Sequence, residues 1–226
     1  MNSSILETDV QTFITNHLGS DTIRILLGKS PFKNVSTREL VTQIESKKRC
    51  EKKLPLWYST PGIYYPPKIS IEQASSQATA KYKAQLIKGE HVLDATGGFG
   101  VDSYYFSLHV QRVVHCEINE ALSTIVRHNA ETLHAKHLFC HVGDGMTYLQ
   151  NSNEQFDTIY IDPSRRLNTH KVFKITDCEP DVKANLDLLT KKYARVIIKT
   201  SPLLDIKSGL ADLKNVREIH VVSVKN

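Results

Sequence analysis

Residues 91–102 carry the strongest chemical signal in this chain. They read His-Val-Leu-Asp-Ala-Thr-Gly-Gly-Phe-Gly-Val-Asp, a short apolar run that ends at Asp94 and continues into a glycine-rich loop at 97–100. The pattern predicts a strand, a tight loop and a helix, which is how open α/β sheets hold nucleotide-like ligands at the carboxyl ends of their strands. Glycines suit such a loop because the backbone must turn sharply and let a ligand approach closely.

The acid at the mouth of this loop indicates the charge of the ligand. A carboxylate at Asp94 favours a cationic ligand over a pyrophosphate. S-adenosylmethionine fits this requirement, because it carries an ammonium and a sulfonium and no phosphate.

Three later strands are each expected to bring another acid to the same edge of the sheet. Glu117 ends the second strand, where it can accept hydrogen bonds from ribose hydroxyls. Asp144 follows the third and is placed to accept from an exocyclic amine such as that of adenine, and Asp162 follows the fourth. Each acid alone could be a helix cap or a turn residue. Four acids at four successive strand ends favour a single ligand site.

Several segments resemble S-adenosylmethionine-dependent methyltransferases of class I. Residues 92–103 are similar to the first motif of ribosomal RNA guanine-N2 methyltransferases and of trimethylguanosine synthases. Residues 72–83, 162–166, 177–181 and 199–205 resemble bacterial methyltransferases that carry a THUMP-like C-terminal domain.

This resemblance covers roughly residues 54–224 and implies a Rossmann-like, mostly parallel α/β sheet. It implies that the glycine loop holds the methionine end of the cofactor, Glu117 the ribose and Asp144 the adenine. It also implies that Asp162 and Pro163 border the site of methyl transfer. The candidate cofactor-binding residues lie at strand ends or in the glycine loop: Asp94, Thr96, Gly98, Gly100, Glu117, Asp144 and Gly145.

The residues after Asp162 differ from the comparable motif of base-amino methyltransferases, where a second proline and an aromatic follow. Here Ser164 and Arg165 follow Pro163. A guanidinium can stack on a base or clamp a phosphate. We expect Asp162 to position the acceptor and Arg165 to orient it. The alternative for Arg165 and Arg166 is a role in salt bridges.

The chain carries a net charge of +5, and residues 1–70 hold 10 Lys or Arg against 6 Asp or Glu. A basic run at 47–53 is either a phosphate-binding surface or a solvated helix end. RNA is the expected substrate, with a base amino group as the methyl acceptor. We expect it to bind near Arg165, Arg166 and Lys199. A small metabolite is the alternative substrate.

The chain divides into a helical N-terminal extension and loop at 1–70 and a methyltransferase domain at 71–226. The expected strands cover 91–94, 112–117, 137–142, 157–161, 195–199 and 218–224. The expected helices cover 8–18, 21–27, 36–54, 72–87, 102–109, 119–134, 145–151, 180–193 and 205–213. The methyltransferase fold has a seventh strand after the sixth, so the sequence favours a truncated or incomplete chain.

Other features limit the function classes. No apolar run is long enough for a membrane span, and no signal peptide is evident at the start. Four cysteines without close pairs predict a reduced, cytoplasmic protein. His137, Cys140 and His141 do not form a convincing metal site, so no metal is expected. Two alternatives remain, a nicotinamide-dependent oxidoreductase and a catalytically silent RNA-binding module.

Overall fold

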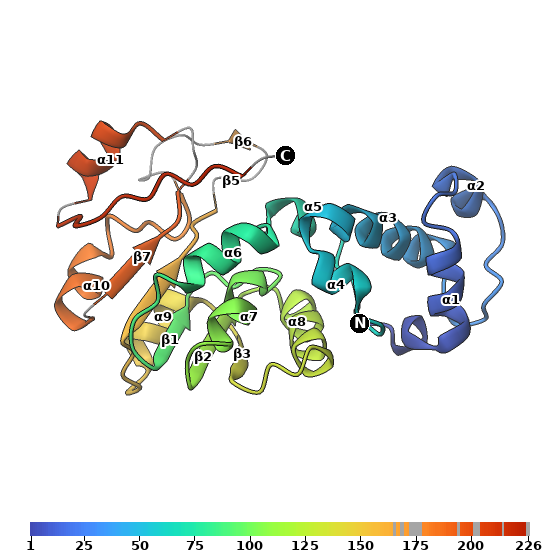
Figure 1. Cartoon of the computed structure of the whole chain (residues 1–226), viewed down its shortest axis with the longest axis horizontal. Helices are drawn as coiled ribbons and strands as arrows, with labels where there is room; N and C mark the ends of the chain where they lie inside the picture. The colour runs from blue at the N-terminus through green and yellow to red at the C-terminus, as the bar shows by residue number, and fades with distance from the viewer. Residues whose placement is uncertain are drawn as a thin grey trace.

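A parallel five-stranded sheet lies in the left half of the molecule in Figure 1, and the first helices extend away from it to the right. The computed structural model describes residues 1–164, 166–167, 170–171, 178–193, 195–200, 204–213 and 215–224. The strand order is β3-β2-β1-β4-β7, and every neighbouring pair is parallel. The strands are β1 (His91–Asp94), β2 (Arg112–Glu117), β3 (Leu138–Val142), β4 (Thr158–Ile161) and β7 (Arg195–Ile198). The expected α/β class and the first five expected strands are confirmed.

This strand order has a functional consequence. The chain steps from β1 to β2 and β3 in one direction and then returns to β4 on the other side of β1. Ligands of open α/β sheets bind at such a switch point, beyond the carboxyl ends of the strands. A two-stranded antiparallel ribbon, β5 (Arg166–Leu167) with β6 (His170–Lys171), follows β4.

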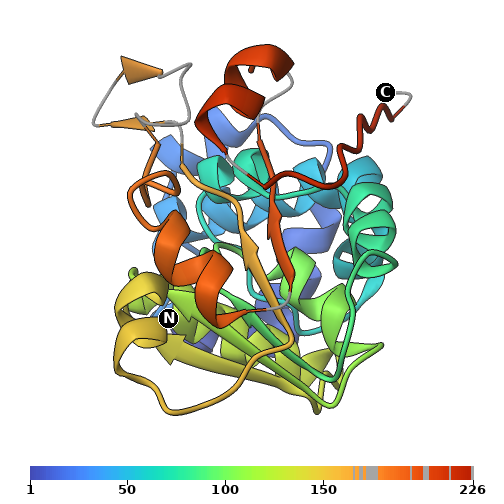
Figure 2. The same ribbon diagram turned by 90° about the vertical axis from the view of Figure 1, so that its left-hand side faces the viewer.

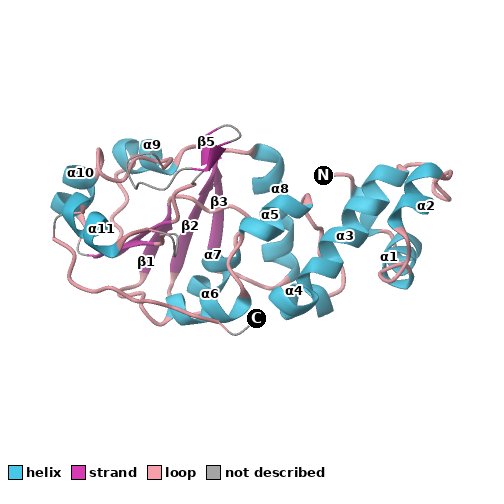
Figure 3. Cartoon of the chain, turned by 90° about the horizontal axis from the view of Figure 1, so that it is seen from above, coloured by secondary structure: helices cyan, strands magenta, loops and turns pink. Residues whose placement is uncertain are grey.

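Helices cover both faces of the sheet (Figure 3). The helices that follow the strands are α7 (Val101–Ser107), α8 (Glu120–Thr132), α9 (Gly145–Asn151), α10 (Leu186–Lys192) and α11 (Ile206–Asp212). Figure 2 views the sheet from the β7 side, with α10 in front and the N-terminal helices behind. This alternation of strands and helices gives a parallel sheet with two buried faces.

The two faces of the sheet form separate hydrophobic clusters, because successive side chains of a strand point to opposite sides. On β4, Tyr160 packs into the cluster that includes residues of α7 and α8. Its neighbours Ile159 and Ile161 pack with α9 and α10 residues on the other face. Tyr160 therefore lies on the same face as the helix that follows the glycine loop.

The N-terminal helices extend to one side of the sheet (Figure 1), and their buried side chains continue the first of these clusters. They are the 3-10 helix η1 (Ser3–Leu6) and α1 (Thr8–Asn16), α2 (Thr22–Leu27), α3 (Thr37–Lys53), α4 (Pro55–Ser59), α5 (Lys68–Gln73) and α6 (Gln77–Ala84). A capping box formed by Ser36 and Glu39 begins α3.

Two buried amides, one on α8 and one on α3, clip the segment at Tyr64 and Tyr65 that connects the N-terminal helices with the rest of the chain. The Asn129 side chain of α8 accepts from the backbone N–H of Tyr64 and donates to its carbonyl, both at 2.9 Å. Gln43 of α3 makes the same paired contacts with the backbone of Tyr65, at 2.9 and 2.7 Å. Each amide satisfies both backbone groups of an otherwise irregular buried segment.

The aromatic residues before the sheet domain pack in the interior. Trp57 is 2% exposed and lies edge-on to Tyr104 of α7, with ring centroids 5.0 Å apart. The Tyr65 hydroxyl donates to the Trp57 carbonyl at 2.7 Å. This segment, which includes α4, therefore packs against the core, and Trp57 and Tyr65 do not form a base-stacking surface.

Several sequence predictions of elements are wrong. The helix expected at 72–87 is split, because residues 74–76 adopt extended backbone and Ser76 caps a new helix. The helix expected at 180–193 begins only at Leu186. No strand forms at 218–224: this segment is fixed by side-chain contacts from Glu218 and His220 and pairs with no described strand.

Within the part of the chain that the structure describes, no helix is long and apolar enough to cross a membrane.

Candidate functional site

The glycine loop between β1 and α7 has the close packing that its sequence predicts. Gly98 and Gly100 have φ angles of 54° and 74°, a region that favours glycine. Gly97 is needed for another reason: a Cβ there would lie 2.2 Å from the imidazole of His115. The Gly97 N–H donates to the carbonyl of Cys116 at 2.8 Å, which ties the loop to β2.

The side chain of His115, on β2, packs directly against this loop. Its imidazole is completely buried, and Nε2 lies 3.2 Å from the carbonyl oxygen of Gly98. Burial lowers the pKa of His115 to about 4, because a charged ring would be poorly solvated there. The ring is therefore neutral at physiological pH.

Asp94 ends β1 beneath the glycine loop and is 1% exposed. One carboxylate oxygen accepts from the N–H of Thr96 at 3.1 Å, and the other accepts from the hydroxyl of Ser103 at 2.5 Å. Burial raises the pKa of Asp94 to about 7. Asp94 thus fastens both the loop and the first turn of α7, and its carboxyl is poised to respond to a nearby cation.

Glu117 ends β2 beside the loop. Its carboxylate accepts from the N–H of Gly98 at 3.0 Å and from the N–H of Asn119 at 2.7 Å. These two bonds use one oxygen each. A carboxylate has about four acceptor positions, so Glu117 retains capacity for two further donors, as a ribose diol would supply.

Asp144 caps α9 at the end of β3. The hydrogen bonds it accepts from the N–H and hydroxyl of Thr147, at 2.7 and 2.8 Å, both reach Oδ1. The next residue, Gly145, is buried, and a Cβ there would lie 2.3 Å from the carbonyl oxygen of Ala95. Gly145 therefore lets the start of α9 approach the residue that precedes Thr96.

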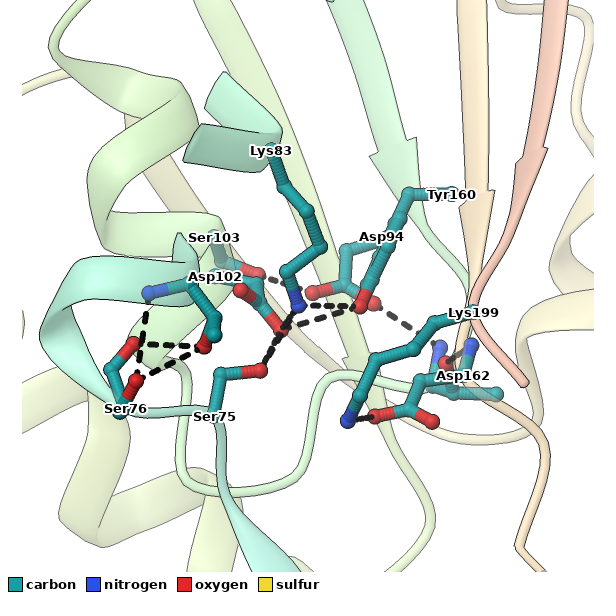
Figure 4. Close-up of polar contacts among 11 residues, drawn as sticks. Ser75, Ser76, Lys83, Asp94, Asp102, Ser103, Tyr160, Asp162 and Lys199 are labelled. Atoms are coloured by element: carbon teal, nitrogen blue, oxygen red, sulfur yellow. Dashed lines mark hydrogen bonds and ion pairs between the residues drawn. The ribbon is translucent and has the colours of Figure 1, made fainter. Parts of the chain in front are cut away.

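Asp162 follows β4, and its backbone N–H donates to the hydroxyl of Thr96 at 2.6 Å. Its carboxylate forms an ion pair with the ammonium of Lys199, which follows the neighbouring strand β7 (Figure 4). Burial raises the pKa of Asp162, and the Lys199 ammonium opposes that rise. The pair brings together two of the predicted transfer-site residues.

A second, more deeply buried ionic group lies beside this pair, and sequence reasoning missed it. We call it the Lys83 cluster; its members are Ser75, Lys83, Asp102 and Tyr160. The Lys83 ammonium donates to Ser75 Oγ at 2.7 Å, to Asp102 Oδ2 at 2.6 Å and to the Tyr160 hydroxyl at 2.8 Å (Figure 4). All three of its donors are therefore used.

Asp102 accepts most of the hydrogen bonds in the Lys83 cluster. Its Oδ2 also accepts from the hydroxyls of Ser75 and Tyr160, at 2.7 and 3.0 Å. Burial lowers the pKa of Lys83, and Asp102 opposes this change. Lys83 and Asp102 lie within segments that the sequence singles out, but nothing in their spacing shows that they meet.

The side chains of the two arginines predicted to bind substrate cannot be placed in the site. Arg165 lies outside the described residues. Arg166 lies in β5, and its side chain is not among those described. In the basic run at 47–53, Arg49 forms an ion pair with Glu72 at 3.0 Å, and Lys53 donates to the carbonyls of residues 71 and 72. Part of that run is therefore engaged within the protein.

Among the described residues, no group of three or more His, Cys, Asp or Glu side chains could hold a metal ion. Cys50, Cys116 and Cys140 are free thiols.

Comparisons with known proteins agree with the fold and with the predicted enzyme class. No protein-family model matches the chain. A solved structure from Porphyromonas gingivalis, described as that of a candidate methyltransferase, superposes with a TM-score of 0.77 and 30% identity. The match covers 92% of this chain and 52% of that one. This chain thus has the Rossmann-like fold of the class I methyltransferases.

Two curated relatives come from strains of Mycobacterium tuberculosis. Both are named as uncharacterized S-adenosylmethionine-dependent methyltransferases and are 24% identical over 156 residues. The matches cover 69% of this chain and 41% of each relative. The chain spans about half of the solved structure and less than half of the curated relatives. Their names agree with the predicted cofactor as well as the predicted class.

Proposed function

We propose that this protein is an S-adenosylmethionine-dependent methyltransferase. The observation that carries the proposal is the arrangement of one glycine loop and four acids at a single edge of the sheet. Asp94, Glu117, Asp144 and Asp162 lie at the carboxyl ends of four adjacent parallel strands around the switch point between β1 and β4. The methyltransferase names of the similar proteins support the same enzyme class.

The residues present suit this cofactor. Gly98 and Gly100 provide a loop that other residues would strain, and the methionine end would lie there beside Asp94. Glu117 would accept from the ribose hydroxyls, and Asp144 would accept from the adenine amine while Gly145 allows close approach. The cofactor supplies a methyl group that its sulfonium already activates, so positioning of the acceptor contributes most of the rate.

The chain's own part in the transfer is to hold the acceptor in line. Asp162 would accept a hydrogen bond from the acceptor's amino group, next to Pro163. Lys199 forms an ion pair with one of its carboxylate oxygens and so favours the charged form of Asp162. Arg165 would orient the acceptor through stacking or a phosphate contact.

We propose RNA as the substrate, with a base amino group as acceptor. Lys199 lies at the transfer site, and Arg165 and Arg166 follow β4 in sequence. A filter-binding series with bulk RNA at rising salt tests this idea. If these cations neutralise about three phosphates, log K should fall with log salt with a slope of about −2. Absence of binding at low salt would leave a small molecule or a protein as the acceptor.

Calorimetric titration tests the cofactor directly. We expect S-adenosylmethionine and S-adenosylhomocysteine to bind and NAD not to bind. Asp94→Ala should weaken binding by about 1.5–3 kcal/mol, the value of a charge-assisted hydrogen bond. NAD binding alone would favour the oxidoreductase, whereas RNA binding without cofactor binding would favour a silent RNA-binding module. Unchanged affinity in folded Asp94→Ala would remove Asp94 from the site.

Two further proposals concern the cellular location of the protein and its division into units. Free cysteines in buried strands, such as Cys116, suit a reducing compartment, and we propose a cytoplasmic location. We also propose that the helical part, residues 1–70, and the methyltransferase domain, residues 71–226, are distinct units of one packed body.

A further inference from the structure

We propose that the Lys83 cluster is a positioning device that aligns the cofactor loop with the transfer site. The inference rests on the proposed function and gives a role to residues outside the cofactor and acceptor positions named above. Its core is the juxtaposition of three elements: α6 supplies Lys83, α7 supplies Asp102 and β4 supplies Tyr160.

The cluster is connected to the cofactor loop through α7. Asp102 and Ser103 are neighbours in the first turn of α7, directly after Gly100. Asp102 is bonded to Lys83, while Ser103 is bonded to Asp94 at the end of β1. Fixing Asp102 therefore fixes the helix start that closes the glycine loop.

The cluster is connected to the transfer site through β4. Tyr160 and Asp162 are two residues apart, with only Ile161, the last residue of β4, between them. The Tyr160 carbonyl accepts from the N–H of Ala95 at 2.9 Å, and the Asp162 N–H donates to Thr96. The loop is thus held at its first residues by β4 and at its last residues by α7, and the Lys83 ammonium joins these two supports.

The burial of the cluster makes this arrangement sensitive to change. Lys83 and Asp102 are 9% and 8% exposed, and the Lys83 ammonium also lies 5.0 Å from the centre of the Tyr160 ring. The Asp102 Oδ1 atom is buried and accepts no hydrogen bond from the described residues. Removing the Lys83 charge would leave a buried carboxylate without its cation, which strongly disfavours the observed geometry.

The test separates positioning from stability. Lys83→Met should lower both the unfolding midpoint in urea and the affinity for S-adenosylhomocysteine, the latter by about tenfold. The double variant Lys83→Met/Asp102→Asn removes both charges. It should regain most of the stability, since a buried pair can be replaced by neutral groups. Its affinity should stay about tenfold below wild type, because α7 and β4 remain without their shared cation.

A matched control uses the same substitution at an exposed pair. Lys183 lies 2.7 Å from Asp212, and its side chain is 48% exposed. Lys183→Met should change S-adenosylhomocysteine affinity by less than twofold. Failure of the wild-type protein to bind S-adenosylhomocysteine overturns the proposed function and this inference with it. Wild-type binding together with undiminished affinity in the double variant overturns the inference alone.

Discussion

The two ends of the candidate site are built in different ways. At the proposed adenosine end, Glu117 and Asp144 are partly exposed and accept mainly from backbone N–H groups, those of Gly98 and Asn119 for Glu117 and that of Thr147 for Asp144. At the proposed transfer end, the Lys83 cluster and the Asp162–Lys199 pair join buried or partly buried side chains from α6, α7, β4 and the residue after β7. The first end consists of carboxylates at strand ends that accept from backbone N–H groups. The second end is a buried ionic network.

This difference separates two physical tasks. Carboxylates with unused acceptor positions can take new donors without losing the bonds that hold them. Buried ions hold their geometry strongly because any unpaired charge is costly in a low-dielectric interior. We infer that the adenosine end is adapted to ligand exchange and the transfer end to fixed geometry. The following predictions test that comparison.

The largest effect is expected at the loop that joins the two ends. Gly97→Ala should weaken S-adenosylhomocysteine binding by about a hundredfold, equivalent to about two lost hydrogen bonds. The reason is that its Cβ would lie 2.2 Å from the buried His115 ring. Calorimetry measures the affinity, and urea unfolding shows whether the variant folds.

A second substitution checks this explanation. Gly98→Ala meets nothing closer than 3.9 Å, so it tests the positive φ alone, which costs about 1–2 kcal/mol. The double variant Gly97→Ala/His115→Ala should bind better than Gly97→Ala because the clash is gone. Equal binding by Gly97→Ala and wild type would contradict the steric role of Gly97.

The next effect concerns pH. Because the pKa of Asp94 is about 7 in the folded protein, a bound cation should favour its charged form and release a proton. S-adenosylmethionine affinity should then rise about tenfold per pH unit between about pH 5 and 7 and level off above. Calorimetry in buffers of different ionisation enthalpy counts the released protons. Asp94→Asn should bind without this proton release.

The same group affects the stability of the ligand-free protein. Its folded pKa, about 7, lies above the ordinary value of 3.8, so the folded state holds more protons than the unfolded state between these values. The contribution of Asp94 to stability therefore falls as pH rises from about 4 to 7. Urea unfolding of wild type and Asp94→Asn at several pH values isolates this contribution. Parallel pH profiles of the two proteins would contradict it.

The contrast between the two ends of the site also explains which of its residues could be predicted from the sequence. Asp94 and Glu117 end their strands and Asp144 comes two residues after one, so hydrophobic runs and turn residues locate them. Ser75, Lys83 and Tyr160 carry no such local signal, because their meeting depends on how α6 and β4 pack on one face of the sheet. The prediction of a strand at 218–224 was wrong for the same reason, because β-branched residues do not indicate which strand they would pair with.

A smaller effect is expected at the junction with the N-terminal helices. Asn129→Ala should destabilise the protein by about 2 kcal/mol, because it leaves the buried N–H and carbonyl of Tyr64 without partners. Affinity for S-adenosylhomocysteine should change by less than about twofold, since the clip makes no contact with the loop. Urea unfolding and calorimetry on one preparation measure both. Gln43→Ala, which cuts the matching clip at Tyr65, serves as the second test.

The smallest effect is expected at an exposed ion pair on the same sheet. Arg112 begins β2 and lies 3.1 Å from Glu154, with side chains 35% and 39% exposed. Solvent screens such pairs, so Arg112→Gln should cost less than about 1 kcal/mol. This pair also lies at the amino end of β2, away from the loop, so cofactor affinity should stay the same. If urea unfolding showed a loss as large as that of Lys83→Met, burial would not be what distinguishes the transfer end.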